Sequence, residues 1–222
     1  MTIDSGAPLP RWGGITEPMT VLTNVILAVV AFVLGARLAY AAAAEGAAAS
    51  GFLALGLVST AVAAAFGAAA HGLDPRVDRV QRERCWRGAL YVTGLAGAST
   101  IASVAYFVTR GDVRTAMLAV AAIKLLAYLA RVARRAEFRV AAQDYGVSLA
   151  VLVVAAAYAV ARWAAPAGPW LIAGVAVSLV AGLVQARRLT LHRHFNHNDL
   201  FHLVQIAALY LFYRGGTLLV DR

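Results

Sequence analysis

Two histidines in distant parts of the chain have neighbours and spacings from which a metal site can be built. His71 closes the run Gly67-Ala-Ala-Ala-His71, and His202 closes Asn198-Asp199-Leu-Phe-His202. In a helix, Asn198 and His202 share a face at a spacing of four residues, and Asp199 joins them at a spacing of three. Imidazole and carboxylate groups suit Zn²⁺, and a catalytic zinc takes three protein ligands and a water. The pattern therefore predicts a zinc site with His71, His202 and Asn198 or Asp199 as ligands.

A second interpretation uses the same two residues without a metal. His71 and His202 would then be interfacial histidines that bond to the backbone, and the spacing alone leaves both interpretations open. His197 is a candidate only if the first turn of its helix is unwound, because five residues correspond to about 140° around a helix axis. We keep it as an alternative ligand.

One further pair of charged residues falls inside apolar sequence. Lys124 is the only lysine of the chain, and Asp144 follows twenty residues later. If the two segments form a hairpin that turns near Arg135, the two side chains differ in depth by about 4–5 Å, which a lysine side chain can span. We expect a structural ion pair. The alternative is a catalytic role for Asp144, for example as a general base, or binding of a substrate carboxylate.

The composition excludes a water-soluble domain. Of 222 residues, 61% are hydrophobic and 14% are charged, whereas soluble domains have about 45–50% and 25%. The net charge of +9 does not indicate nucleic-acid binding, because the arginines lie between apolar blocks, where membrane proteins keep their topology signals. The single cysteine, Cys85, excludes an intrachain disulfide.

Seven segments are long and apolar enough to cross a bilayer, which takes roughly 20 residues. They are 19–42, 51–73, 87–109, 114–134, 138–163, 168–187 and 198–216. The fold class predicted is an all-α bundle of seven transmembrane helices, with residues 1–222 forming one integral membrane domain. The polar N-terminal residues lack the pattern of a signal peptide.

The distribution of arginines gives the orientation. Thirteen arginines lie on the side of the N-terminus and six on the other side. The positive-inside rule then predicts a cytoplasmic N-terminus and an external C-terminus. We expect an integral protein of the inner (cytoplasmic) membrane of a bacterium.

Polar residues of several predicted helices fall at one depth near the cytoplasmic side. Besides the two histidines, this layer contains Glu17, Thr20, Thr23, Asn24, Gln143, Asp144 and Gln185. The outer half of the segments is almost entirely Ala, Val, Leu and Ile. A polar residue inside a membrane is costly and is often functional. The asymmetry therefore predicts a site that opens toward the cytoplasm.

Three stretches of the chain resemble the CREST superfamily of seven-helix membrane hydrolases, which includes the alkaline ceramidases and the adiponectin-receptor group. They are similar to the acidic entry to helix 1, the Ser-x-x-x-His motif of helix 2 and the His-x-x-x-His motif of helix 7 with its tail. In this chain they read Glu17-Pro-Met-Thr-Val-Leu-Thr-Asn24, Phe66-Gly-Ala-Ala-Ala-His71-Gly, and Asn198-Asp-Leu-Phe-His202-Leu with Leu209-Tyr-Leu-Phe-Tyr213-Arg. The predicted orientation is that of the adiponectin-receptor branch.

The resemblance implies a zinc ion held by one histidine of helix 2 and two of helix 7, with a serine and an aspartate that assist attack of bound water on a lipid amide. His71 and His202 match two of the ligands. Gly67 stands at the serine position, Asn198 stands at the first histidine of helix 7, and the third helix contains no Asp or Glu. Glu17, Asn24 and His197 are candidates for supporting hydrogen bonds or for alternative ligands.

Two functional hypotheses follow. The first is a membrane-embedded, zinc-dependent hydrolase of a lipid amide or ester, in which Asp144 or Asp199 transfers protons. The second is a non-catalytic protein on the same scaffold that binds a lipid or senses the state of the membrane. A transporter, or a haem protein with His71 and His202 as axial ligands, is a third, weaker alternative.

Overall fold

Long helices account for most of the chain. The computed structural model describes residues 11–74, 76, 78–192 and 194–222. Within them the helices are α1 (Pro18–Glu45), α2 (Ala48–Gly72), α3 (Arg79–Val108), α4 (Gly111–Arg134), α5 (Phe138–Trp163), α6 (Ala167–Ala186) and α7 (His197–Gly216). A small antiparallel hairpin, β1 (Arg11–Trp12) and β2 (Ile15–Thr16), precedes α1. The all-helical class predicted from composition is confirmed.

Six of the helices, α1 to α6, are long and apolar enough to cross a membrane. The chain is therefore an integral membrane protein by the length and composition of its helices. The seventh helix, α7, has 20 residues but lower hydropathy, because Asn198, Asp199, His202 and Gln205 fall in its first turns. Asn198, Asp199 and His202 are candidate site residues predicted from the sequence, whereas Gln205 was not among them.

The ends of the helices coincide with residues that favour helix termination or initiation. Pro18 occupies the first turn of α1, where its missing N–H costs nothing. Gly46 ends α1 with a φ of 67°, a left-handed conformation that glycine adopts without steric cost. The next helix begins two residues later, so a tight turn joins α1 to α2.

The predicted boundaries differ most at the start of α3. The apolar pattern suggested residue 87, whereas the helix begins at Arg79. The intervening residues Arg79 to Trp86 lie between two of the predicted apolar segments. They are charged but have good helix propensity, so the helix continues beyond the apolar span. Trp86 Nε1 donates to Ala136 O at 2.8 Å, which fixes this extension to the α4–α5 connection.

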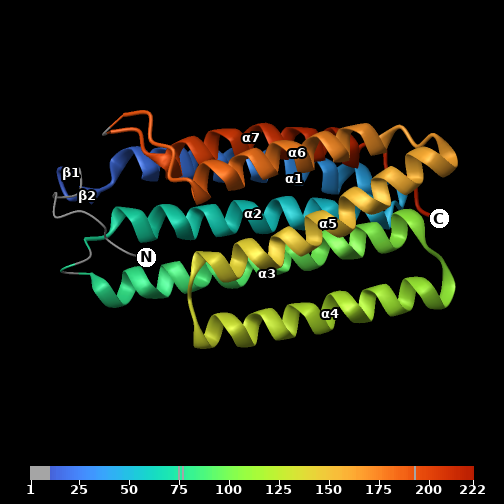
Figure 1. Ribbon diagram of the computed structural model, residues 1–222, viewed down its shortest axis with the longest axis horizontal. Coiled ribbons are helices and arrows are strands. Elements are labelled where there is room, and N and C mark those ends of the chain that lie inside the picture. Colours follow the sequence, from blue (N-terminus) through green and yellow to red (C-terminus); the bar gives the residue numbers. More distant parts are fainter. Residues whose placement is uncertain (1–10, 75, 77, 193) are drawn as a thin grey trace.

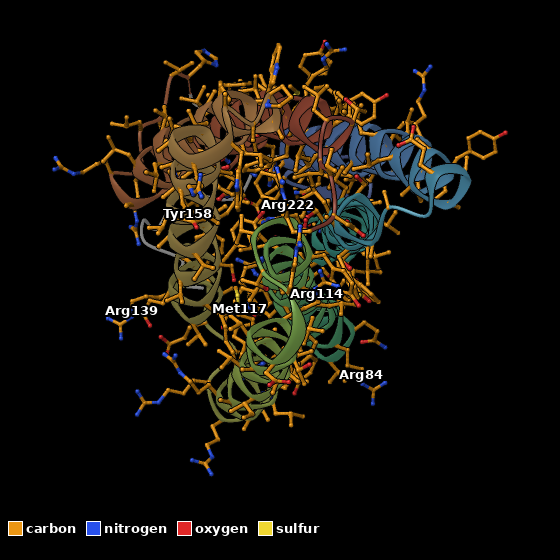
Figure 2. All side chains as sticks on the ribbon, turned by 90° about the vertical axis from the view of Figure 1, so that its right-hand side faces the viewer. Arg84, Arg114, Met117, Arg139, Tyr158 and Arg222 are labelled. Carbon is orange, nitrogen blue, oxygen red and sulfur yellow. The ribbon has the colours of Figure 1, made fainter. Side chains whose placement is uncertain are left out.

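Six helices form a closed ring of contacts in the order α1, α2, α3, α5, α6, α7 and back to α1. The helix α4 lies outside this ring and packs chiefly on α3, as Figure 1 shows at its lower edge. The view along the helices in Figure 2 also places α4 at the periphery. Its main buried side chains are Ala121, Tyr128 and Val132. The functional layer must therefore be built mainly from the helices of the ring.

The interior of the ring is closely packed. Buried alanines and leucines of α1, α2, α5 and α7 fill most of it. Between α2, α3, α5 and α7 there is a cavity of about 10 Å³ lined by Leu57, Thr60, Thr100, Tyr145 and Phe212, among others. That volume is about the space of one water molecule, so this cavity does not accommodate a lipid chain.

The C-terminal residues pack against the end of the bundle opposite the β1–β2 hairpin (Figure 1). Both carboxylate oxygens of Asp221 accept hydrogen bonds from the first turn of α2, from Ala48 N and Ala49 N at 2.8 Å each. The Arg222 guanidinium stacks 4.2 Å from the centre of the Trp163 ring. Arg114 NH2 donates to Arg222 O, and the two arginines lie close together in Figure 2. These contacts hold α2, α4 and α5 together at this end.

Candidate functional site

Helices α1, α2 and α7 bring their polar residues together at the end of the bundle where the β1–β2 hairpin lies. We call this the hairpin end. In Figure 1 the start of α1 and the start of α7 lie at the same end as β1 and β2. The end of α2 and the start of α3 lie at that end too, because consecutive helices run in opposite directions. The members of the predicted layer that lie in or next to α1, α2 and α7 are thus brought together, whereas Gln143 and Asp144 of α5 pair with Arg131 and Lys124 instead.

Glu17 begins this group from the residue before α1. Its backbone is left-handed, with φ 47° and ψ 55°, a conformation that is uncommon for a residue with a side chain. The side chain is only 8% exposed. Its Oε2 lies within hydrogen-bond distance of His71 Nδ1, at 2.9 Å, and 3.7 Å from Arg82 Nη2. The strained turn before Pro18 therefore places a buried carboxylate against an imidazole of α2 and a guanidinium of α3.

Arg82 lies in the helical extension of α3, between two of the membrane-spanning segments predicted from the sequence. Its Nε donates to Ala70 O at 2.9 Å, a carbonyl in the last turn of α2. The same side chain approaches Glu17, so one arginine links the end of α2 with the start of α1. Sequence reasoning did not single it out, because five arginines crowd this segment and only the fold shows which of them turns inward.

Thr23 connects α1 with α7. Its Oγ1 lies 3.0 Å from His202 Nδ1 and 3.3 Å from Asp199 Oδ1. It is also 3.2 Å from Thr20 O of its own helix. The hydroxyl of one residue thus contacts an imidazole, a carboxylate and a carbonyl. Thr23 was recognised in the sequence only as one of several polar residues at this depth.

Asp199 has a structural role at the start of α7. Its Oδ2 accepts from Asn196 N at 2.7 Å, and the Asn196 side chain accepts from Asn198 N at 2.8 Å. The two residues form a capping box, which satisfies backbone donors that a helix start leaves unpaired. Asp199 is 0% exposed, and both of its oxygens take part in hydrogen bonds.

His71 and His202 are the two histidines of the predicted layer. Each is 7% exposed, and His71 is close enough to act electrostatically on His202. Each ring engages its Nδ1, with Glu17 and with Thr23 respectively. For neither Nε2 is there a hydrogen bond to any residue in the described ranges. The arrangement matches that of metal-binding histidines, whose second nitrogen is held by an oxygen.

The other predicted ligands are engaged elsewhere. Asn198 Oδ1 accepts from Gln185 Nε2 of α6 at 2.9 Å. His197 is the first residue of α7 and lies within electrostatic range of Glu17 and His71. Across the part of the chain that the structure describes, no three His, Cys, Asp or Glu side chains are grouped as metal ligands. The structure therefore provides two imidazoles for a metal ion and no third protein ligand among those residues.

Asn24 occupies the space beside Gly67. The Asn24 amide nitrogen donates to Thr20 O at 3.0 Å. A Cβ atom added to Gly67 would lie 2.9 Å from Asn24 Oδ1, which is closer than such atoms pack. In this chain the asparagine of α1 takes the place of a side chain on α2.

Lys124 and Asp144 lie apart from this network, between α4 and α5. Lys124 Nζ is 2.6 Å from Asp144 Oδ2, and their side chains are 15% and 7% exposed. A Cβ atom on Gly97 of α3 would lie 3.2 Å from that oxygen and 2.9 Å from Ser148 Oγ. The absence of a side chain at Gly97 makes room for the pair. Asp144 is thus placed for an ion pair, and the structure does not bring it to the histidines.

Fold and site together define a class: a polytopic helical membrane protein with a buried histidine–carboxylate network at one end of its bundle. A family model matches residues 19–221, and the chain therefore belongs to this family, described as a family of unknown function (DUF6962). No curated protein matches the chain. No solved structure matches it either.

Proposed function

We propose that the protein is a seven-span membrane protein that binds a transition metal ion through the Nε2 atoms of His71 and His202. We propose further that it hydrolyses a lipid amide or ester there. The observation that supports this proposal best is the state of the two imidazoles. Each has its Nδ1 next to an oxygen of Glu17 or Thr23 and its Nε2 without a hydrogen bond among the described residues.

The donor set fits zinc in part. Neutral imidazole is a common ligand of Zn²⁺, and the two rings come from helices that the fold brings together. With two protein ligands, more coordination positions are open than in the usual catalytic site. A bound zinc would act as a Lewis acid toward a lipid carbonyl and would lower the pKa of its water toward 7. Zinc is therefore the cofactor we propose.

The residues around the histidines would have distinct tasks in such a reaction. Asp199 is engaged in the capping box and with Thr23, so it keeps the start of α7 in place. Glu17 is the carboxylate next to His71 that remains available for proton transfer. Arg82 Nη2 lies 3.7 Å from Glu17 Oε2 and would hold this carboxylate in place. Asp144, paired with Lys124, would have no part in the chemistry.

The proposed orientation places this network near the inner leaflet. With α7 counted as the seventh span, the arginine distribution gives a cytoplasmic N-terminus and an external C-terminus. The hairpin end of the bundle would then face the cytoplasm. A lipid substrate would enter from the membrane at that end, because the central cavity is about the size of one water molecule.

A non-catalytic lipid-binding or sensing protein is the second candidate. The close approach of Asn24 to Gly67 favours it, because a serine at that position would collide with the asparagine. The missing third ligand among the described residues favours it as well.

Metal analysis of the detergent-purified protein tests the proposal first. We expect about one zinc per chain in the wild type and a loss of that zinc in His71→Ala and His202→Ala. His192→Ala, which changes a histidine of the exposed α6–α7 connection, is the matched control and should retain the metal. Wild-type protein without stoichiometric metal would contradict the proposed site.

A fatty-acid release assay over ceramides and other membrane lipids then separates the two candidates. A metal-dependent release that both histidine variants abolish supports the hydrolase. Stoichiometric zinc with no release from any lipid supports the non-catalytic protein and contradicts the hydrolase.

A further inference from the structure

The two proposed metal ligands are each contacted by a residue at or just before the start of α1, although neither ligand belongs to that helix. Glu17 contacts the ring of His71, and Thr23 contacts the ring of His202. Both contacts are made to Nδ1, at 2.9 and 3.0 Å, and both are buried. Because both rings make this contact through Nδ1, the tautomer of each ring depends on whether the partner oxygen accepts or donates the hydrogen bond.

At His71 the assignment of the proton follows directly. A carboxylate oxygen only accepts hydrogen bonds, so Nδ1 is the donor and carries the hydrogen. In a neutral imidazole the other nitrogen is then a lone-pair acceptor. The Nε2 of His71 is therefore available to a metal ion. The guanidinium of Arg82 lies 3.7 Å from the same carboxylate oxygen, Glu17 Oε2.

At His202 the assignment depends on the other contacts of Thr23. The hydroxyl has one hydrogen and two lone pairs. Two of its three neighbours, Thr20 O and Asp199 Oδ1, are acceptors. If the hydroxyl donated to His202, both of these acceptors would face its lone pairs. The hydroxyl therefore donates toward Asp199 or Thr20 and accepts from Nδ1–H of His202.

We propose that Glu17 and Thr23 are the positioning residues of the site, each holding one histidine in the Nδ1–H tautomer with Nε2 free for the metal. This inference rests on the proposed metal site for its purpose, but the tautomers are a property of the metal-free protein. Supporting oxygens of this kind change metal affinity by about 10–100-fold when they are removed.

The first experiment measures the tautomers directly. In metal-free protein with ¹⁵N-labelled histidine, in detergent micelles, ¹⁵N chemical shifts distinguish protonated from bare ring nitrogens. His71→Asn and His202→Asn assign the signals. We expect both rings to carry the hydrogen on Nδ1. Thr23→Val should release His202 from this tautomer, whereas Thr23→Ser, which keeps the hydroxyl, should preserve it.

The second experiment measures metal binding with Co²⁺, whose visible absorption reports tetrahedral coordination. We expect Thr23→Val and Glu17→Ala to weaken Co²⁺ binding about 10–100-fold. Thr23→Ser and Glu17→Gln, which keep an oxygen acceptor, should recover most of the affinity. They also keep the test valid if a larger change unfolds the protein.

Two matched variants control for the loss of a hydroxyl or a charge. Thr93→Val removes a hydroxyl of α3 that donates to Ala89 O, and Glu83→Gln neutralises an exposed partner of Arg87. Neither should change the tautomers or the Co²⁺ affinity. If both did so as strongly as the α1 variants, the assignment to Glu17 and Thr23 would be overturned.

The remaining outcomes separate this inference from the proposed function. Nε2–H tautomers in the wild type, or full Co²⁺ affinity in Thr23→Val and Glu17→Ala, overturn the positioning roles while the metal site stands. Nδ1–H tautomers in a wild type that binds no Co²⁺ support the hydrogen-bond assignment and overturn the metal site.

Discussion

Asn24 and Gly67 illustrate how one residue can replace another across a helix interface. The asparagine amide fills the space beside the glycine, and it is fixed by its hydrogen bond to Thr20 O. The sequence alone showed that Gly67 lacks a hydroxyl. It did not show that a polar group of α1 occupies the same space, because that requires the packing of α1 on α2.

Gly67→Ser should therefore destabilise the protein. The new Cβ atom would lie 2.9 Å from Asn24 Oδ1, and overpacking of this kind costs about 1–3 kcal/mol. Thermal unfolding in detergent measures the change. Removing the obstacle in the double variant Gly67→Ser/Asn24→Ala should recover most of the stability. A single variant as stable as the wild type would show that Asn24 moves freely.

The ion pair of Lys124 and Asp144 is expected to show strong coupling. Both side chains are largely buried and 2.6 Å apart, so neutralising one leaves the other as an unpaired charge in an apolar environment. Lys124→Met and Asp144→Asn should each cost about 3–5 kcal/mol, and the double variant should cost much less than their sum. A double-mutant cycle in detergent gives the coupling energy.

The exposed pair of Glu83 and Arg87 is the control for this cycle. Its side chains are 53% and 37% exposed, and such helix pairs contribute about 0.3–0.5 kcal/mol. An equally small coupling energy between Lys124 and Asp144 would show that this ion pair does not stabilise the packing of α4 against α5.

At the scale of the elements, the start of α2 is stabilised by a residue from the far end of the chain. Ala47, at the N-cap position, has no side chain that can accept a hydrogen bond. Asp221 accepts from Ala48 N and Ala49 N in its place. A carboxylate at a helix start also interacts favourably with the helix dipole.

Asp221→Ala should lower the stability by about 1 kcal/mol, the usual cost of losing a cap. Asp221→Asn, which retains an oxygen acceptor, should lose less. Asp112→Ala, in the first turn of α4, is a suitable comparison. Melting temperatures of the three variants in one detergent provide the measurement, and an unchanged Asp221→Ala protein would contradict the capping role.

The helices were largely predictable, and the exceptions have a physical cause. Apolar length locates α1, α2 and α4 to α7 within a few residues, because each segment must cover the same apolar thickness. It fails at the start of α3, since a helix can extend into water when its residues have good helix propensity. Arg82 lies in that extension, and its contact with Glu17 was therefore missed.

The site was predictable as a layer and not as a set of contacts. Helical depth placed His71 and His202 near each other, since the end of α2 and the start of α7 lie at the same end of the bundle. It did not reveal that Thr23 lies between His202 and Asp199. Such contacts depend on the rotation of each helix about its own axis, which is set by packing throughout the bundle.

For the whole molecule, the proposed orientation can be tested with the native cysteine. Cys85 lies in the extension of α3 at the hairpin end and is partly exposed. In intact cells it should not react with a membrane-impermeant maleimide. Cys85→Ser/Arg110→Cys, which moves the thiol to the opposite end next to α4, should react. Labelling of Cys85 in intact cells, without labelling of a cysteine at position 110, would contradict the proposed orientation and indicate the opposite one.

The two imidazoles at the hairpin end remain the centre of the account at this scale, because they join helices that are far apart in the sequence. Anomalous diffraction at the zinc absorption edge, from crystals of the purified protein, tests their role most directly. We predict a single anomalous peak about 2.0–2.1 Å from Nε2 of both His71 and His202. A map without a peak between these rings, or with zinc bound only at another group, would contradict the proposed metal site.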